Sequence, residues 1–110
     1  MMMETNGDTL MVVMEGELDL KVAGLLRRQL EDSLDRFKVR NLVLDLSRVV
    51  FIDSSGLGLI LGRYKRINAA GGKVALVGSQ PQVRRILELS GLLRIMVEYS
   101  SPSEALDNIS

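Results

Sequence analysis

The chain has 110 residues, of which 46% are hydrophobic and 25% are charged, a composition typical of one folded domain. Fourteen basic and fourteen acidic residues balance, so the net charge gives no electrostatic reason to expect nucleic-acid binding. The sequence contains neither Cys nor His, which excludes disulfides, thiol nucleophiles and Ser-His-Asp triads. We therefore expect a binding or switching module rather than an enzyme, in a reducing, cytoplasmic setting. No cofactor or metal is predicted, and any metal would have to be a hard cation held by carboxylates. No apolar run reaches the ~20 residues that span a bilayer.

The first half of the chain predicts strands around one long helix. Residues 1–7 allow a short edge strand, and the apolar, β-branched run over residues 9–15 predicts a second strand. Asp19 occupies an N-cap position, and the apolar residues then recur at helical spacing as far as Phe37. The side of this helix that we expect to be buried carries Val22, Leu25, Leu26, Leu30, Leu34 and Phe37.

The second half alternates strands and helices. Strands are predicted over residues 41–46, extended by 49–52, and over 73–77 and 95–99. A second helix follows the Asp53 turn and ends at Ala70-Gly71-Gly72, and a third begins at Pro81 and ends at Ser90-Gly91. A capping box, Ser101-Pro102-Ser103-Glu104, starts a short terminal helix. The predicted buried side of the second helix carries Leu57, Ile60, Leu61, Tyr64 and Ile67.

This order of elements predicts an α/β fold for residues 1–110 as one domain. Strands joined through helices are expected to run parallel with right-handed crossovers, whereas the two N-terminal strands can pair antiparallel. The expected architecture is a mixed, mostly parallel sheet with about four helices packed against it.

The turn Asp53-Ser54-Ser55-Gly56-Leu57-Gly58 carries the most distinctive chemistry of the chain. It joins a buried strand to a helix N-terminus, where backbone N–H groups are free and negative charge is favoured. Two hydroxyl groups at this position are exposed enough to be modified. The alternative interpretation is a simple N-cap, with the glycines easing the turn.

Two other sequence patterns are weaker indications of a functional site than this turn. Gly56, Gly58 and Gly62 resemble a dinucleotide fingerprint, but Leu61 stands where its third glycine belongs, so close packing of helix on sheet explains Gly58 and Gly62 better. Asp45 resembles the acceptor of a phosphorylated receiver domain, but the acidic pair and the lysine of that site are missing.

Several charged residues are best explained as solvated. Glu15 and Glu17 fit an exposed turn, and Arg63, Lys65 and Arg66 fit an exposed helix face that an acidic partner would otherwise contact.

Four segments together resemble one known family: GELD (Gly16–Asp19), LVLDLS (Leu42–Ser47), FIDSSGLGLILGRYK (Phe51–Lys65) and LSGLL (Leu89–Leu93). With this spacing over nearly the whole chain, the sequence resembles the STAS-domain anti-anti-sigma factors. The long central run most resembles the sporulation members, which antagonise the anti-sigma-F factor.

The resemblance implies a mechanism and a set of residues. In this family the unphosphorylated protein binds an anti-sigma factor that is also a serine kinase, and so frees a sigma factor. Phosphorylation ends the complex, and a serine phosphatase restores it. The modified serine follows the Asp directly, which makes it Ser54 here, with Ser55 as the second choice. The partner-binding residues implied are Asp19, Asp53, Ser54, Ser55, Gly56, Leu57 and Gly58, with no membrane or direct nucleic-acid contact. The alternative is a STAS module that senses a nucleotide or another anion at the same turn.

Overall fold

The computed structural model describes residues 1–109 and contains one five-stranded sheet in the order β1-β2-β3-β4-β5. The strands are β1 (Met2–Asn6), β2 (Thr9–Leu18), β3 (Asn41–Ile52), β4 (Val74–Val77) and β5 (Val97–Tyr99). Strand β1 pairs antiparallel with β2, and every other neighbouring pair is parallel. The predicted mixed, mostly parallel sheet is therefore confirmed.

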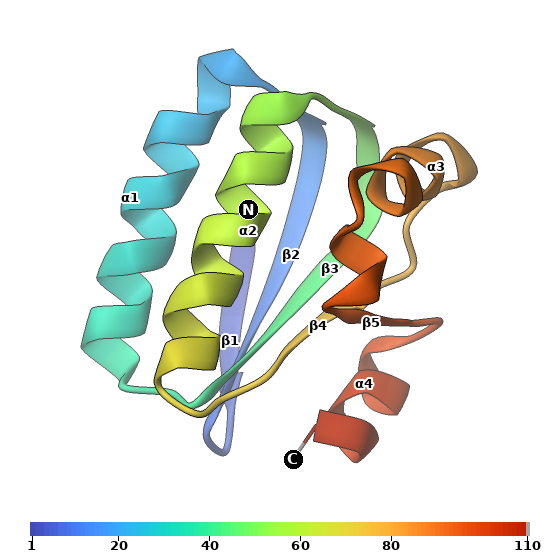
Figure 1. Cartoon of the computed structure of the whole chain (residues 1–110). Helices are drawn as coiled ribbons and strands as arrows, with labels where there is room; N and C mark the ends of the chain where they lie inside the picture. Colours follow the sequence, from blue (N-terminus) through green and yellow to red (C-terminus); the bar gives the residue numbers. More distant parts are fainter. Residues whose placement is uncertain (110) are drawn as a thin grey trace.

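Four α-helices connect and cover the strands, as predicted (Figure 1). Helices α1 (Leu20–Phe37) and α2 (Ser54–Ala69) lie side by side over one face of the sheet. Helix α3 (Pro81–Ser90) adds buried side chains to the same core, and α4 (Pro102–Ile109) packs on the opposite face. A short 3-10 turn, Leu92–Arg94, follows α3 and was not predicted.

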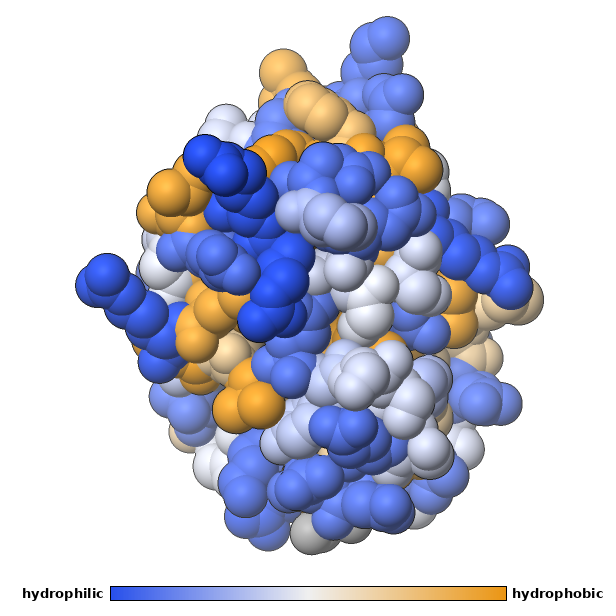
Figure 2. All heavy atoms as spheres, turned by 90° about the vertical axis from the view of Figure 1, so that its right-hand side faces the viewer, coloured by the Kyte–Doolittle hydropathy of each residue, from blue (hydrophilic) through white to orange (hydrophobic). Residues whose placement is uncertain are grey.

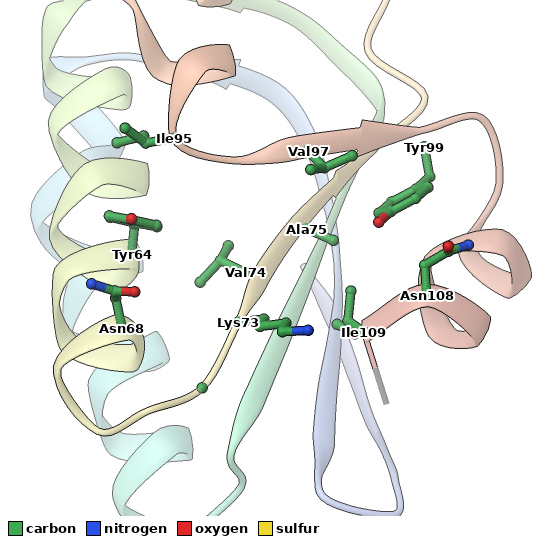
Figure 3. Close-up of a pocket in the computed structure, with 11 residues that line it drawn as sticks. Tyr64, Asn68, Lys73, Val74, Ala75, Ile95, Val97, Tyr99, Asn108 and Ile109 are labelled. Atoms are coloured by element: carbon green, nitrogen blue, oxygen red, sulfur yellow. The ribbon is translucent and has the colours of Figure 1, made fainter.

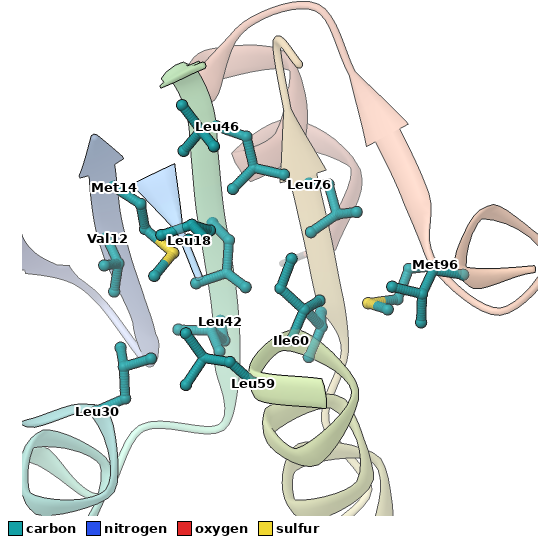
Figure 4. Close-up of a cluster of buried hydrophobic side chains, with 14 of the residues drawn as sticks. Val12, Met14, Leu18, Leu30, Leu42, Leu46, Leu59, Ile60, Leu76 and Met96 are labelled. Carbon is teal, nitrogen blue, oxygen red and sulfur yellow. The ribbon is translucent and has the colours of Figure 1, made fainter. Parts of the chain in front are cut away.

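The main core lies between the sheet and helices α1, α2 and α3 (Figure 4). Alternate residues of each strand point into it, because successive side chains of a strand face opposite sides of the sheet. On β3 these residues are Leu42, Leu44 and Leu46, whereas Val43 faces α4. A smaller cluster on the other face joins Val43, Ala75 and Val77 to Ala105 and Ile109 of α4.

The burial of α1 differs from the expected face. Leu30 and Leu34 are buried as predicted, but Leu25 and Phe37 are exposed. Helix α1 lies at the edge of its layer, so the side of the helix away from α2 has no neighbour (Figure 1).

The buried side of α2 is also broader than predicted. Ile60 and Ile67 are buried as expected, but so are Leu59 and Arg63, while Leu61 is only half-buried. Arg63 is 7% exposed and its Nε lies 3.0 Å from Oε2 of Glu31 on α1. The predicted solvated face is thus wrong for Arg63, because α1 covers that side of α2; Lys65 is exposed.

The last strand is shorter than predicted, since β5 begins at Val97 and Ile95 is the C-cap of the 3-10 turn. Figure 2 shows the side of the molecule that carries α3, β5 and α4. Its surface is largely hydrophilic, with scattered hydrophobic side chains. Within residues 1–109, none of the helices combines the length and the apolar character needed to cross a membrane.

Candidate functional site: two neighbouring helix N-termini

The unequal lengths of the strands define the place of the site. Strand β4 pairs only with Leu42–Asp45 of β3, whereas β2 continues beside β3 as far as Ile52. The ends of β2 and β3 therefore extend beyond β4, and Leu18 lies opposite Ile52 in the ladder. Because both strands lead directly into helices, the N-termini of α1 and α2 lie next to each other (Figure 1). Binding sites of open α/β sheets cluster at such carboxyl ends.

Asp53 joins the two helix N-termini through hydrogen bonds. Its Oδ1 accepts from the backbone N–H groups of Ser55 at 2.8 Å and Gly56 at 3.1 Å, which makes it the N-cap of α2. Its Oδ2 accepts from the N–H of Leu20, in α1, at 3.3 Å. The Asp53 N–H donates in turn to the carbonyl of Leu18 at 3.2 Å. One carboxylate thus caps α2 and fixes the start of α1.

Asp19 lies at the second of these N-termini. Its side chain accepts from the backbone N–H of Lys21 at 3.1 Å, so it is the N-cap of α1, as predicted. The structure therefore brings Asp19 and Asp53 to one end of the sheet, although 33 residues separate Leu20 from Asp53.

Gly56 is required by close packing rather than by an unusual backbone conformation. A Cβ atom at this position would lie 2.2 Å from the Leu18 carbonyl oxygen and 2.7 Å from Cγ1 of Ile52. By contrast, nothing lies within 4 Å of a Cβ built at Gly58 or Gly62. The expectation that close packing on the sheet explains these two glycines is wrong.

The two serines of the turn differ in accessibility. Ser54 is the first residue of α2 and is exposed, whereas Ser55 is half-buried. Leu57 is half-buried and packs against the main core, and Gly58 is exposed. Ser54 is therefore the more accessible hydroxyl of the pair for a macromolecular partner.

Three exposed apolar residues flank the turn, and the sequence patterns did not single them out. Leu20 is 77% exposed, Val50 is 49% exposed and Phe51 is 46% exposed. Apolar residues in a strand usually indicate burial, so the pattern gives no signal for Val50 and Phe51. Exposed apolar side chains next to polar capping groups are more typical of a protein contact surface than of a solvated turn.

The geometry weakens the anion-binding alternative. The N–H groups of Ser55 and Gly56, which a bound phosphate would need, already donate to Asp53.

Asp45 lies within β3 rather than at a strand end, is half-buried, and accepts from the N–H of Ser47 at 2.9 Å. No group of three acidic side chains able to hold a metal ion occurs among residues 1–109.

A hollow of about 280 Å³ lies elsewhere, between α2, the β4–β5 edge and α4 (Figure 3). Its walls include Tyr64 and Asn68 from the C-terminal half of α2, Lys73 directly before β4, and Tyr99 from β5. None of the predicted site residues lines this hollow.

Known proteins resemble the chain along almost its whole length. An anti-sigma F factor antagonist of Paenibacillus polymyxa is 41% identical over 107 residues, which cover 97% of this chain and 92% of that protein. The unphosphorylated form of the anti-sigma factor antagonist SpoIIAA superimposes with a TM-score of 0.85 at 29% identity, covering 98% of this chain and 94% of the other. The phosphorylated form of the Bacillus cell fate determinant SpoIIAA gives a TM-score of 0.77 at 28% identity, over 99% and 98% of the two chains.

These similarities agree with the resemblance inferred from the DSSG turn and its flanking strands. The model of the STAS domain matches residues 1–105, so the chain belongs to the STAS-domain family.

Proposed function

We propose that residues 1–110 form one STAS domain that acts in the cytoplasm as an anti-sigma factor antagonist of the sporulation type. In its unphosphorylated form it binds an anti-sigma factor that is also a serine kinase, and so frees a sigma factor. Phosphorylation of Ser54 ends this complex, and a serine phosphatase restores it. The exposure of Ser54 at the start of α2, between two joined helix N-termini, is the observation that carries the proposal. The relatives named anti-sigma F factor antagonist support it.

The proposed contact surface consists of Asp19, Asp53–Gly58 and the exposed apolar residues Leu20, Val50 and Phe51. These apolar side chains supply area that loses contact with water when a partner binds. Ser54 lies inside this surface, so an unmodified hydroxyl can pack against the partner at little cost. The chain is thus the substrate of the kinase rather than an enzyme.

Phosphorylation would act through local charge rather than by unfolding α2. A phosphoryl group adds about −1.5 to −2 charges next to the Asp53 carboxylate, which lies within the proposed contact surface. A helix N-terminus stabilises negative charge, so α2 should remain intact. In the complex the phosphoryl group would lose its hydration water. It would also lie against the charges of a partner surface that is complementary to a neutral hydroxyl, and both effects would weaken binding.

The test uses the cognate kinase, ATP and two matched serine variants. Intact-mass measurements should show one added phosphoryl group on the wild type and on Ser55→Ala, and none on Ser54→Ala. Titration calorimetry should show that Ser54→Ala still binds the kinase, because the variant keeps the Asp53 cap and adds no charge. The phosphorylated wild type should bind the kinase at least about tenfold more weakly than the unphosphorylated protein does. Ser54→Asp should lose part of the wild-type affinity for the kinase.

Two results would contradict the proposal at different points. Stoichiometric phosphorylation of Ser54→Ala would move the modified residue to Ser55 or elsewhere. Equal kinase affinity of the phosphorylated and unphosphorylated proteins would refute the switch, wherever the phosphate lies.

A further inference from the structure

On one face of the sheet, the two strands β1 and β2 have no covering helix. On the side of the sheet that α4 occupies, β1 and β2 present Met2, Glu4, Met11 and Val13. Together with Asp45 of β3 they border a hollow of about 570 Å³, which we call the back groove. Met2 is 56% exposed. Apolar surface gathered in a hollow is typical of a site for another molecule, whereas the hydrophobic side chains in Figure 2 are scattered.

The width of the uncovered surface fits one α-helix. Strands lie about 4.8 Å apart and a helix with side chains is about 10 Å wide, so one helix covers roughly two strands. On the front face, α1 and α2 form a layer of two helices. On the back face α4 packs on Val43 of β3 and on Ala75 and Val77 of β4, and it lies away from β1 (Figure 1). Met11 of β2 packs against the edge of the α4 cluster, and Pro102 of α4 borders the back groove. Helix α4 therefore forms one wall, and the surface over β1 and β2 beside it is left with the width of one further helix.

The charges around the back groove indicate which kind of helix fits. Glu4 is exposed and Asp45 is half-buried beside the apolar floor. No residue that lines the groove, within residues 1–109, is basic. Methionine side chains are flexible and polarizable, so Met2 and Met11 can adapt to different apolar side chains.

We propose that the back groove binds an amphipathic helix of a partner protein, with an apolar stripe on the groove floor and Lys or Arg beside Glu4 and Asp45. Strand β1 has five residues, about 17 Å, which corresponds to about 11 helical residues. The groove shares no residue with the surface around Ser54, so this second docking surface does not depend on the proposed function.

The experiment uses two synthetic helical peptides with the same leucine stripe, one carrying Lys and the other Glu on the remaining positions. Titration of the full chain, followed by amide NMR shifts, should show saturable binding of the Leu/Lys peptide. The shifts should concentrate at residues 2–4 and 11–13 and leave 54–58 unchanged. Glu4→Lys should lower the affinity for the Leu/Lys peptide by about fivefold or more, and should raise the affinity for the Leu/Glu peptide.

Asp32→Lys is the matched control, because Asp32 is exposed on α1 and the substitution changes the net charge equally. The control should leave the affinity of the Leu/Lys peptide nearly unchanged. Equal losses in Asp32→Lys and Glu4→Lys would show non-specific attraction and overturn the proposal, as would no binding or shifts centred on residues 54–58. A concentration-dependent dimer in sedimentation, abolished by Met2→Glu, would show that a second copy covers the groove and would also overturn it.

Discussion

Gly56 shows how one missing side chain allows the turn to form. The first turn of α2 lies directly against the backbone of β2, with the position of a Cβ at Gly56 only 2.2 Å from the Leu18 carbonyl. This close approach is what allows Asp53 to reach the N–H of Leu20 in the neighbouring helix. Packing of backbone on backbone at Gly56 therefore sets the geometry around Ser54.

A pair of glycine variants tests this role. Gly56→Ala should destabilise the protein by about 1–3 kcal/mol or more, since the added methyl group meets backbone that cannot give way. Gly58→Ala, two residues along the same helix, meets open space and should stabilise by about 0.5–1 kcal/mol, because alanine favours helix. Urea denaturation followed by circular dichroism measures both. Effects of the same sign in the two variants would contradict the packing argument.

Helices α1 and α2 are joined a second time, by ion pairs along their length. Glu31 of α1 lies 3.0 Å from Nε of Arg63 and 3.2 Å from Nη1 of Arg66, and Asp35 lies 2.6 Å from Nη2 of Arg66. Burial lowers the pKa of Arg63, whereas the hydrogen bond that Arg66 donates to Asp35 raises the pKa of Arg66. Glu31 is thus the carboxylate that compensates the buried Arg63 charge.

Removing the charge of Glu31 should therefore cost more than an exposed charge normally does. Glu31→Gln is expected to lower the free energy of unfolding by about 1–3 kcal/mol, because the Arg63 guanidinium loses its counter-charge. Asp32→Asn, on the exposed side of the same helix, should stay within about 0.5 kcal/mol of wild type. Thermal and urea denaturation measure the stability of both variants. If the two variants were equally stable, water rather than Glu31 would compensate the charge of Arg63.

Across the whole molecule, local patterns predicted the elements and long-range contacts decided their surroundings. Asp19 and Gly91 marked helix ends correctly because capping depends on residues a few positions away. The exposure of Leu25 and the burial of Arg63 depend on which neighbour covers each helix side, which spacing alone does not reveal. The hydrogen bond from the Leu20 N–H to Asp53 joins segments that are distant in the sequence. The Asp53 turn was therefore predictable as a site, but its attachment to α1 was not.

The long β2–β3 ladder has a consequence for the order of folding. Its paired residues run from Thr9 to Leu18 and from Asn41 to Ile52, whereas β4 has four residues and β5 three. Most of the strand pairing is thus between two strands that are connected by a single 18-residue helix, α1. This short connection keeps the entropy cost of loop closure low. We expect the folding transition state to contain β2, α1 and β3.

Rate measurements on two variants test this order. Val12→Ala, in β2, should slow folding with a φ-value of about 0.5 or more, whereas Ala105→Gly, in α4, should mainly accelerate unfolding with a φ-value below about 0.3. The reverse pattern in stopped-flow experiments would place the nucleus at the C-terminal end. With the expected order, the Asp53 turn follows directly on the last strand of the nucleus. The serine-bearing turn would then be in place while the C-terminal half of the chain is still unfolded.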